Sequence, residues 1–266
     1  MKRGYVETPH GQIHYREEGS GPPVILFHET PSSSVNMIPM IQALSPDMRA
    51  IGMDTMGYGE SDRPPTPYTT MEEFAQSVAW FIQGLGLEKA NLFGMLTGSQ
   101  IALQTAADFP ELVSAVAVQE PFNWGTPSRR AVHERIHRYH TRREDGGHLM
   151  ELWERTRYSK DLKEREVALK NLLKVNDDSG AEVYGSMGWE GAAPYAMCRQ
   201  DMWSVTPRIV APTLVMYFPG SERHRALERF LETLPHGKGT REAPTFRSEP
   251  EATKTMLLDF YKNPGG

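Results

Sequence analysis

The chain has 266 residues, of which 39% are hydrophobic and 24% are charged, and its formal net charge is −5 at pH 7. This balance excludes a disordered chain, gives no basic face for nucleic acid, and leaves no apolar run long enough for a membrane span or a signal peptide. The single cysteine excludes an internal disulfide framework, so the composition favours a soluble cytoplasmic protein without nucleic-acid or membrane partners.

The first part of the chain alternates strand patterns with helical patterns. Residues 12–16 alternate between polar and apolar, as a half-exposed edge strand does, whereas 23–27 form a continuous apolar run typical of a strand buried on both faces. A helix is expected over 35–44 and a strand over 49–54. Thr70 is a suitable N-cap for the amphipathic helix that follows it.

A strand–turn–helix unit comes next. Residues 90–93 predict a strand, 94–98 a turn, and 99–108 a helix, and a further buried strand is expected over 113–118. From 122 to 207 the chain is rich in Arg, Glu and His and carries no strand pattern, so it is expected to be helical.

The sheet pattern then returns near the C-terminus. We expect a strand over 212–218 and a helix over 227–231. A weaker strand over 238–243 and a closing helix over 250–261 follow. Strands that alternate with helices in this way predict βαβ units and a mainly parallel sheet flanked by helices. The expected fold class is therefore α/β, with a core domain of residues 1–121 and 208–266 and a helical cap of residues 122–207 inserted after the sixth strand.

Four features in chain order resemble the α/β-hydrolase fold superfamily. His28 ends an early strand where that family has a His-Gly oxyanion segment, and residues 54–62 resemble its Asp-x-x-Gly-x-Gly-x-Ser loop. Residues 94–98 stand where the Gly-x-nucleophile-x-Gly elbow belongs, and the helical stretch after Glu120 resembles the family's cap. The resemblance implies an α/β-hydrolase sheet with a ligand pocket between sheet and cap.

The catalytic residues of that family are not matched. Leu96 stands at the nucleophile position, and leucine has no lone pair with which to form an ester intermediate. Glu222 is the best match for the catalytic acid, but Thr245 stands where the histidine is expected. Ordinary Ser-His-Asp hydrolysis is therefore not expected, and Thr97 or Ser99 as a substitute nucleophile is only a minor alternative.

Ionisable residues at the carboxyl ends of strands are the best catalytic candidates, because ligands bind at that edge of a parallel sheet. Glu29 and Glu120 are predicted to be the acid and the base, with His28 orienting groups or shuttling protons. Asp54 also ends a strand, where it is expected to brace its own loop. The wider pocket and oxyanion region, including the backbone N–H of Thr97, is predicted from Met95, Leu96, Thr97, Asp54, Glu222 and Thr245.

One further pattern concerns metal binding. Residues 133–137 match the H-E-x-x-H zinc pattern, with His133 and His137 as the two ligands. The flanking arginines, among them Arg129 and Arg130, oppose a bound dication and favour an exposed basic helix. We expect no metal and no cofactor, since no phosphate loop or dinucleotide-binding glycine pattern is present.

These observations favour an enzyme that acts on a small, largely apolar metabolite by acid–base chemistry without an acyl-enzyme. Its reaction would be of the cyclase, lyase, isomerase or decarboxylase type. A catalytically dead pseudo-hydrolase that binds a small molecule or a protein partner is the main alternative, and a metal-dependent or unusual hydrolase is another. The fold does not choose among these reactions, and the sequence leaves substrate and oligomeric state open.

Overall fold

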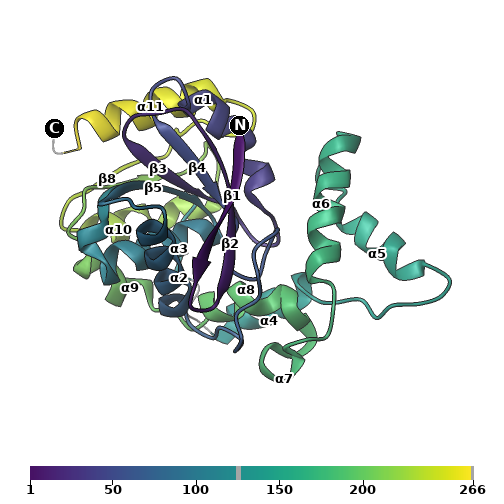
Figure 1. The fold of residues 1–266 in the computed structure, drawn as a ribbon. Coiled ribbons are helices and arrows are strands. Elements are labelled where there is room, and N and C mark those ends of the chain that lie inside the picture. Colours follow the sequence, from purple (N-terminus) through teal and green to yellow (C-terminus); the bar gives the residue numbers. More distant parts are fainter. Residues whose placement is uncertain (124–126, 265–266) are drawn as a thin grey trace.

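The computed structural model describes residues 1–123 and 127–264, with only the backbone of 127–130. Its centre is an eight-stranded sheet of order β1-β2-β4-β3-β5-β6-β7-β8, in which β3 to β8 are parallel and β1 and β2 antiparallel (Figure 1). The strands are β1 (Lys2–Thr8), β2 (Gly11–Glu18), β3 (Pro23–Phe27), β4 (Arg49–Met53), β5 (Ala90–Met95), β6 (Val113–Gln119), β7 (Thr213–Met216) and β8 (Gly237–Thr240). The predicted α/β class and mainly parallel sheet are confirmed.

The edge of the sheet differs from the prediction. Strand β1 was not expected, and it pairs with β2 in register Val6 to Ile13, so β2 is the second strand and not the edge. Val6 is the only fully buried residue of β1. An edge strand that is solvated on most sides needs few apolar residues, which is why its sequence carries little strand signal.

Helices cover both faces of the sheet. The apolar run of β3 has no alternation because both of its faces are buried. Ile25 and Phe27 pack in the core on one face of the sheet, and Val24 and Leu26 pack in the core on the other. The first face is covered by α2 (Met71–Gly84), α3 (Thr97–Asp108) and α10 (Leu227–Thr233), and the second by α1 (Ile38–Leu44) and α11 (Pro250–Lys262). The parallel strands β3 to β7 are thus buried on both sides, whereas the edge strand β8 has no buried residue.

Thr70 is the N-cap of helix α2, as predicted, and forms a reciprocal capping box with Glu73. The Thr70 hydroxyl accepts a hydrogen bond from the Glu73 N–H at 3.4 Å, and the Glu73 carboxylate accepts one from the Thr70 N–H at 2.9 Å. Two N–H groups that the helix itself cannot satisfy are paired in this way.

Loss of this cap is expected to be measurable. Thr70→Ala should lower the free energy of unfolding by about 1 kcal/mol in urea denaturation. Thr255→Ala is the matched control, because Thr255 is exposed inside α11 and alanine favours the helix there. A cap variant as stable as this control would contradict the assignment.

Between β6 and β7 the chain is helical, as predicted. Its helices are α4 (Pro127–Ile136), α5 (Gly147–Arg155), α6 (Leu162–Val175), α7 (Ala181–Tyr184), α8 (Ala192–Met197) and α9 (Met202–Val205). Residues of α8 and α9 belong to the same apolar core as α2 and α3. The division of the chain into a core domain and a cap therefore stays a prediction.

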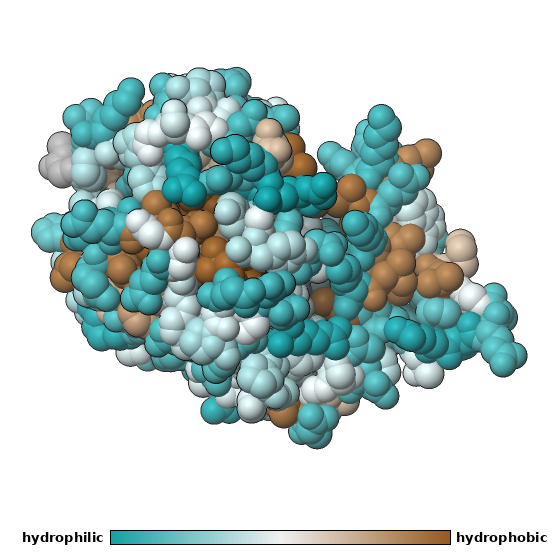
Figure 2. Space-filling view, in the orientation of Figure 1, coloured by the Kyte–Doolittle hydropathy of each residue, from teal (hydrophilic) through white to brown (hydrophobic). Residues whose placement is uncertain are grey.

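Helices α5 and α6 project from the body of the molecule (Figure 1). Apolar side chains are exposed on and beside them, and Figure 2 shows apolar surface in this region. The large ones are Leu149, Met150, Tyr158, Leu162 and Leu173. No helix in the described ranges is both long enough and apolar enough to cross a membrane, and a cytoplasmic location remains a prediction from composition.

Candidate active site

A sharp turn joins β5 to α3 at the single residue Leu96. Its backbone has φ 50° and ψ −112°, a conformation that costs a non-glycine residue about 1–3 kcal/mol. A Cβ on Gly94 would lie 2.2 Å from the carbonyl oxygen of Gly98, and one on Gly98 would lie 2.4 Å from that of Phe27. Only glycine fits at these two positions, so the chain has the strained elbow geometry that its sequence pattern predicts.

Neither Leu96 at the elbow nor Met95 before it has a nucleophilic side chain. Leu96 packs partly buried against the core on the α1–α11 face, and Met95 is buried. The Ser99 hydroxyl is fully buried and lies 2.9 and 2.8 Å from the carbonyl oxygens of Gly94 and Gln119, to which it donates. Ser99 therefore ties the turn to the strand ends, which disfavours it as a substitute nucleophile.

The elbow lies against the end of β3 through a pair of hydroxyls. Thr97 Oγ1 and Thr30 Oγ1 are 2.9 Å apart, and both residues are buried. Among the described residues, no acceptor is bonded to the backbone N–H of either threonine. Two unused N–H groups next to the turn are suited to holding a negatively charged oxygen.

His28 is fully buried and both of its ring nitrogens are used. Nε2 accepts a hydrogen bond from the Thr55 N–H at 3.1 Å, so Nδ1 carries the proton and donates to the Glu29 carbonyl oxygen at 2.8 Å. Burial lowers the pKa of His28 to about 4, against the opposing effect of the Asp54 charge. The predicted orienting role fits this geometry, whereas proton shuttling has no free nitrogen to use.

Asp54 has the bracing role that its position suggested. It is 1% exposed and its carboxylate lies 2.8 Å from His14 Nδ1, and it also accepts from the N–H groups of Ser34 and Glu60. Burial raises the pKa of Asp54, but these hydrogen bonds and the neighbouring histidines outweigh burial and lower it to about 2. The carboxylate therefore holds the loop after β4.

Glu120 is buried, and both oxygens of its carboxylate accept hydrogen bonds. Its carboxylate accepts from the Phe218 N–H at 2.9 Å, from Ser221 Oγ at 2.6 Å and from Arg223 Nη1 at 3.2 Å. It lines a cavity of about 810 Å³ beside β7, and Glu222 lies exposed on the same cavity. In the loop after β7, the side-chain partners of Glu120 are thus Ser221 and Arg223, and not Glu222.

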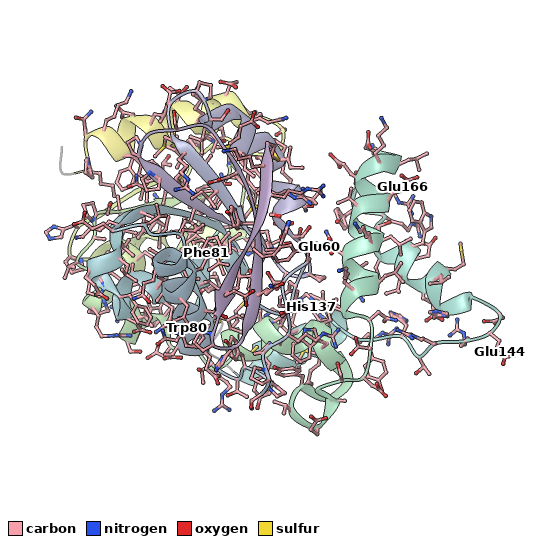
Figure 3. All side chains as sticks on the ribbon, in the orientation of Figure 1. Glu60, Trp80, Phe81, His137, Glu144 and Glu166 are labelled. Atoms are coloured by element: carbon pink, nitrogen blue, oxygen red, sulfur yellow. The ribbon has the colours of Figure 1, made fainter. Side chains whose placement is uncertain are left out.

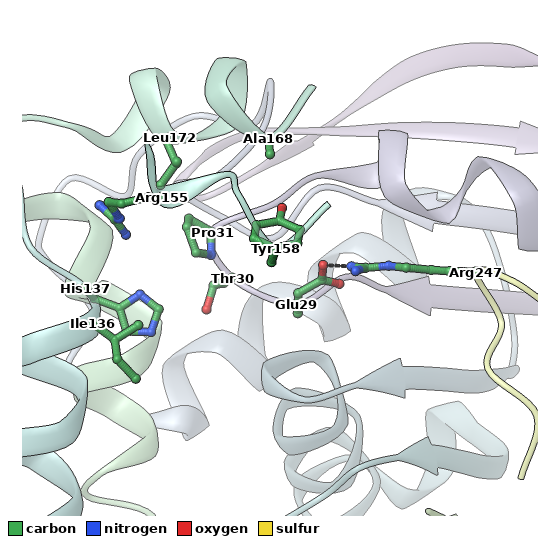
Figure 4. Close-up of a pocket in the computed structure, with 10 residues that line it drawn as sticks. All are labelled: Glu29, Thr30, Pro31, Ile136, His137, Arg155, Tyr158, Ala168, Leu172 and Arg247. Atoms are coloured by element: carbon green, nitrogen blue, oxygen red, sulfur yellow. Dashed lines mark hydrogen bonds and ion pairs between the residues drawn. The ribbon is translucent and has the colours of Figure 1, made fainter. Parts of the chain in front are cut away.

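Glu29 lines a different cavity, of about 350 Å³, between the end of β3 and helices α4 to α6 (Figure 4). Its carboxylate pairs with Arg247 and accepts from Asn36 at 3.3 Å. The two cavities have no lining residue in common, so the predicted acid–base pair of Glu29 and Glu120 does not meet in one pocket. The physical reason is that β5 lies between β3 and β6, which sets the two strand ends about 10 Å apart.

The pocket of Glu29 contains a network that the sequence did not predict. His137 Nδ1 lies 2.9 Å from Glu190 Oε1, and Arg155 Nη1 lies 2.8 Å from Glu190 Oε2. Glu190 is fully buried; burial raises its pKa, but the hydrogen bonds from His137 and Arg155 outweigh burial and lower it. His137 and Arg155 themselves line the pocket (Figure 4).

Glu190 is held in place by the loop after β4. The Tyr58 hydroxyl donates to the Glu190 carbonyl oxygen at 3.1 Å and accepts from the Ala193 N–H at 3.0 Å. Trp189 Nε1 donates to the Gly57 carbonyl oxygen at 2.8 Å. Figure 3 shows His137 where the helical segment meets the body of the molecule.

The second histidine of the H-E-x-x-H pattern belongs to the network around Glu190. His137 is bound to Glu190, and its ring stacks on His133 with centroids 5.4 Å apart. In the part of the chain that the structure describes, no three or more His, Cys, Asp or Glu side chains form a group suited to a metal ion. The side chains of Arg129 and Arg130 lie outside the described residues.

Two other expected pocket residues lie elsewhere. Neither Leu96 nor Thr245 is among the residues that line the Glu29 pocket, and Thr245 is half-buried in the loop before α11. Glu190, Arg155 and Arg247 were missed. The pairing of His137 with Glu190, 53 residues further along the chain, leaves no mark in the sequence around either residue.

Comparison with known proteins relates the first half of the chain to a family. Residues 22–145 match the model of the alpha/beta hydrolase fold. Haloalkane dehalogenase 2 of Mycobacterium bovis is 30% identical over 120 residues, 45% of this chain and 42% of the dehalogenase. The 2-(acetamidomethylene)succinate hydrolase of Mesorhizobium japonicum is 35% identical over 104 residues, 39% of this chain and 37% of that hydrolase. The chain thus matches about two fifths of the length of these curated relatives.

Solved structures agree over the whole chain. A thermophilic esterase from Thermogutta terrifontis, solved with malate bound, superposes with a TM-score of 0.73 at 21% identity, covering 100% of both chains. At this identity the likeness establishes the fold and not the activity. The sheet order, the strained elbow and the family model over residues 22–145 agree, and the chain has the α/β-hydrolase fold.

Proposed function

We propose that this protein is an enzyme that acts on a small molecule in the Glu29 pocket by general acid–base chemistry, without a covalent acyl-enzyme intermediate. The observation that carries the proposal is the His137 imidazole, held by a buried carboxylate at the wall of a pocket beside an elbow whose nucleophile position is leucine. A small molecule, and not a nucleic acid or a membrane, is the proposed partner.

The chemistry follows from the hydrogen bond to Glu190. Nδ1–H of His137 donates to that carboxylate, so Nε2 is the basic atom, with a lone pair that can accept a proton. Glu190 then stabilises the imidazolium that forms when Nε2 takes the proton. The proton comes from a water molecule or from an acidic C–H of the substrate. The backbone N–H groups of Thr30 and Thr97 are suited to the oxygen that becomes negative in either case.

Two chromogenic probes test this role. Para-nitrophenyl hexanoate reports water activation, and nitrobenzisoxazole reports proton abstraction from carbon. We expect turnover of at least one probe, and we expect His137→Gln to lower it by about 10²–10⁴-fold. His140→Gln is the matched control, because His140 makes the same contact to a carboxylate, Glu151, at a partly exposed site.

The absence of an acyl-enzyme is tested on the same reaction. Intact-protein mass spectrometry of the quenched ester reaction should show no mass increase. An adduct, or a His137→Gln variant as fast as the wild type, would overturn the proposal.

A second candidate function is ligand binding without catalysis. It is favoured by the pairing of both predicted catalytic carboxylates with arginines, Glu29 with Arg247 and Glu120 with Arg223, which takes them out of acid–base work. Saturable ligand binding without turnover of either probe would select this pseudo-hydrolase over the enzyme.

A further inference from the structure

We infer that the pocket takes a small amphipathic carboxylate, whose anionic group binds Arg247 and whose apolar tail enters a second chamber beneath α6. This inference rests on the pocket of the proposed function and adds the class of its ligand.

Two adjoining cavities form the chambers of the pocket. The Glu29 cavity of about 350 Å³ adjoins one of about 250 Å³, and the two share Tyr158, Ala168 and Arg247 in their walls. Val35, Pro39 and Val167 supply aliphatic surface to the second chamber, and Lys163 and Glu164 add charged groups of opposite sign to its wall. Such a division favours a ligand with a polar reacting end and an apolar tail, with Arg247 at the junction.

Arg247 lines both chambers and remains able to bind an anion. Its guanidinium contacts Glu29 through Nη2 alone and lies 5.6 Å from the centre of the Phe246 ring. Within the described chain, Nε and Nη1 of Arg247 make no hydrogen bond. A guanidinium with free N–H groups on a second edge matches the two oxygens of a carboxylate.

The second arginine of the pocket, Arg155, is not available to bind a ligand anion. Arg155 is committed to both oxygens of Glu190 and to the carbonyl oxygen of Arg138. Its charge is balanced by that of Glu190, so Arg155 adds no net positive charge on the opposite wall (Figure 4). The anion therefore binds at Arg247, with Glu29 holding the guanidinium from its other side.

Calorimetric titration with hexanoate, hexanamide and hexylamine at constant ionic strength tests the charge requirement. We expect hexanoate to bind about tenfold or more tightly than the neutral hexanamide, since a hydrogen bond to a charged group is the stronger one, and hexylamine not to bind. From butanoate to hexanoate, affinity should rise about fourfold per methylene as the tail fills the second chamber.

Variants locate the anion. Arg247→Met should abolish the preference for hexanoate over hexanamide, and Arg247→Lys should keep part of it. Arg241→Met is the control, because Arg241 makes a similar ion pair with Glu228 on the exposed surface, and it should bind hexanoate like the wild type.

The outcomes separate this inference from the proposed function. Equal binding of hexanoate and hexanamide, no binding of hexanoate up to its solubility limit, or an unchanged preference in Arg247→Met would each overturn the inference. If hexanoate binds as expected while neither chromogenic probe turns over, the acid–base proposal fails alone. If turnover depends on His137 while hexanamide binds as tightly as hexanoate, the carboxylate inference fails alone.

Discussion

Glu190→Ala is expected to lower the free energy of unfolding by about 3 kcal/mol, because it leaves the buried His137 and the partly buried Arg155 guanidinium without their common partner. Removing one member of a buried ion pair costs more than the pair contributes, since the remaining charge stays desolvated. Glu190→Gln should cost less, because an amide oxygen still accepts one hydrogen bond. Urea denaturation at pH 7 measures both variants.

The chain contains its own control for this prediction. Glu151 pairs with His140 and Arg143 in the same His–Glu–Arg arrangement, but its side chain is 44% exposed. Glu151→Ala should therefore cost less than about 1 kcal/mol, as exposed ion pairs usually do. If the two alanine variants are equally stable, burial of Glu190 does not have the energetic effect that the structure implies.

Acid is expected to destabilise the fold in two steps, the first of them set by His28. Burial holds the pKa of His28 at about 4, while the unfolded chain has its ordinary value near 6.5. Between these values the unfolded state binds a proton that the folded state does not, so stability falls as the pH falls. The loss should approach about 3 kcal/mol by pH 4.

The second step belongs to Asp54. Its folded pKa of about 2 lies below its ordinary value of 3.8, so its contribution is fully present above pH 4 and is lost as the pH falls towards 2. This loss should be about 2 kcal/mol. Here too the unfolded state takes up the proton first.

Unfolding free energies measured in urea between pH 7 and pH 4 test the first step. The wild type should lose stability through this range, and His28→Gln should remove most of that slope. His236→Gln is the control, since His236 is exposed, and it should keep the wild-type slope. A His28→Gln variant that keeps the full slope would assign the acid sensitivity to other groups.

Local sequence patterns were sufficient to predict most of the sheet and the elbow turn. The unbroken apolar run of β3, the Thr70 cap and the glycines around Leu96 each reflect a requirement met within a few residues: burial on both faces, unsatisfied helix N–H groups, and a turn too tight for a Cβ. The leucine at the nucleophile position was likewise visible in the sequence. Strand β1 was missed because an edge strand needs almost no apolar signal.

The arrangement of the pocket required the folded chain. Whether a strand-end carboxylate is available or paired depends on residues about 100 to 218 positions away, as with Glu120 and Arg223 or Glu29 and Arg247. His137 was visible as half of a metal pattern, but its partner Glu190 comes from a separate segment. Such contacts arise from packing between distant elements, and the energy of a buried charge depends on those neighbours and not on its own surrounding sequence.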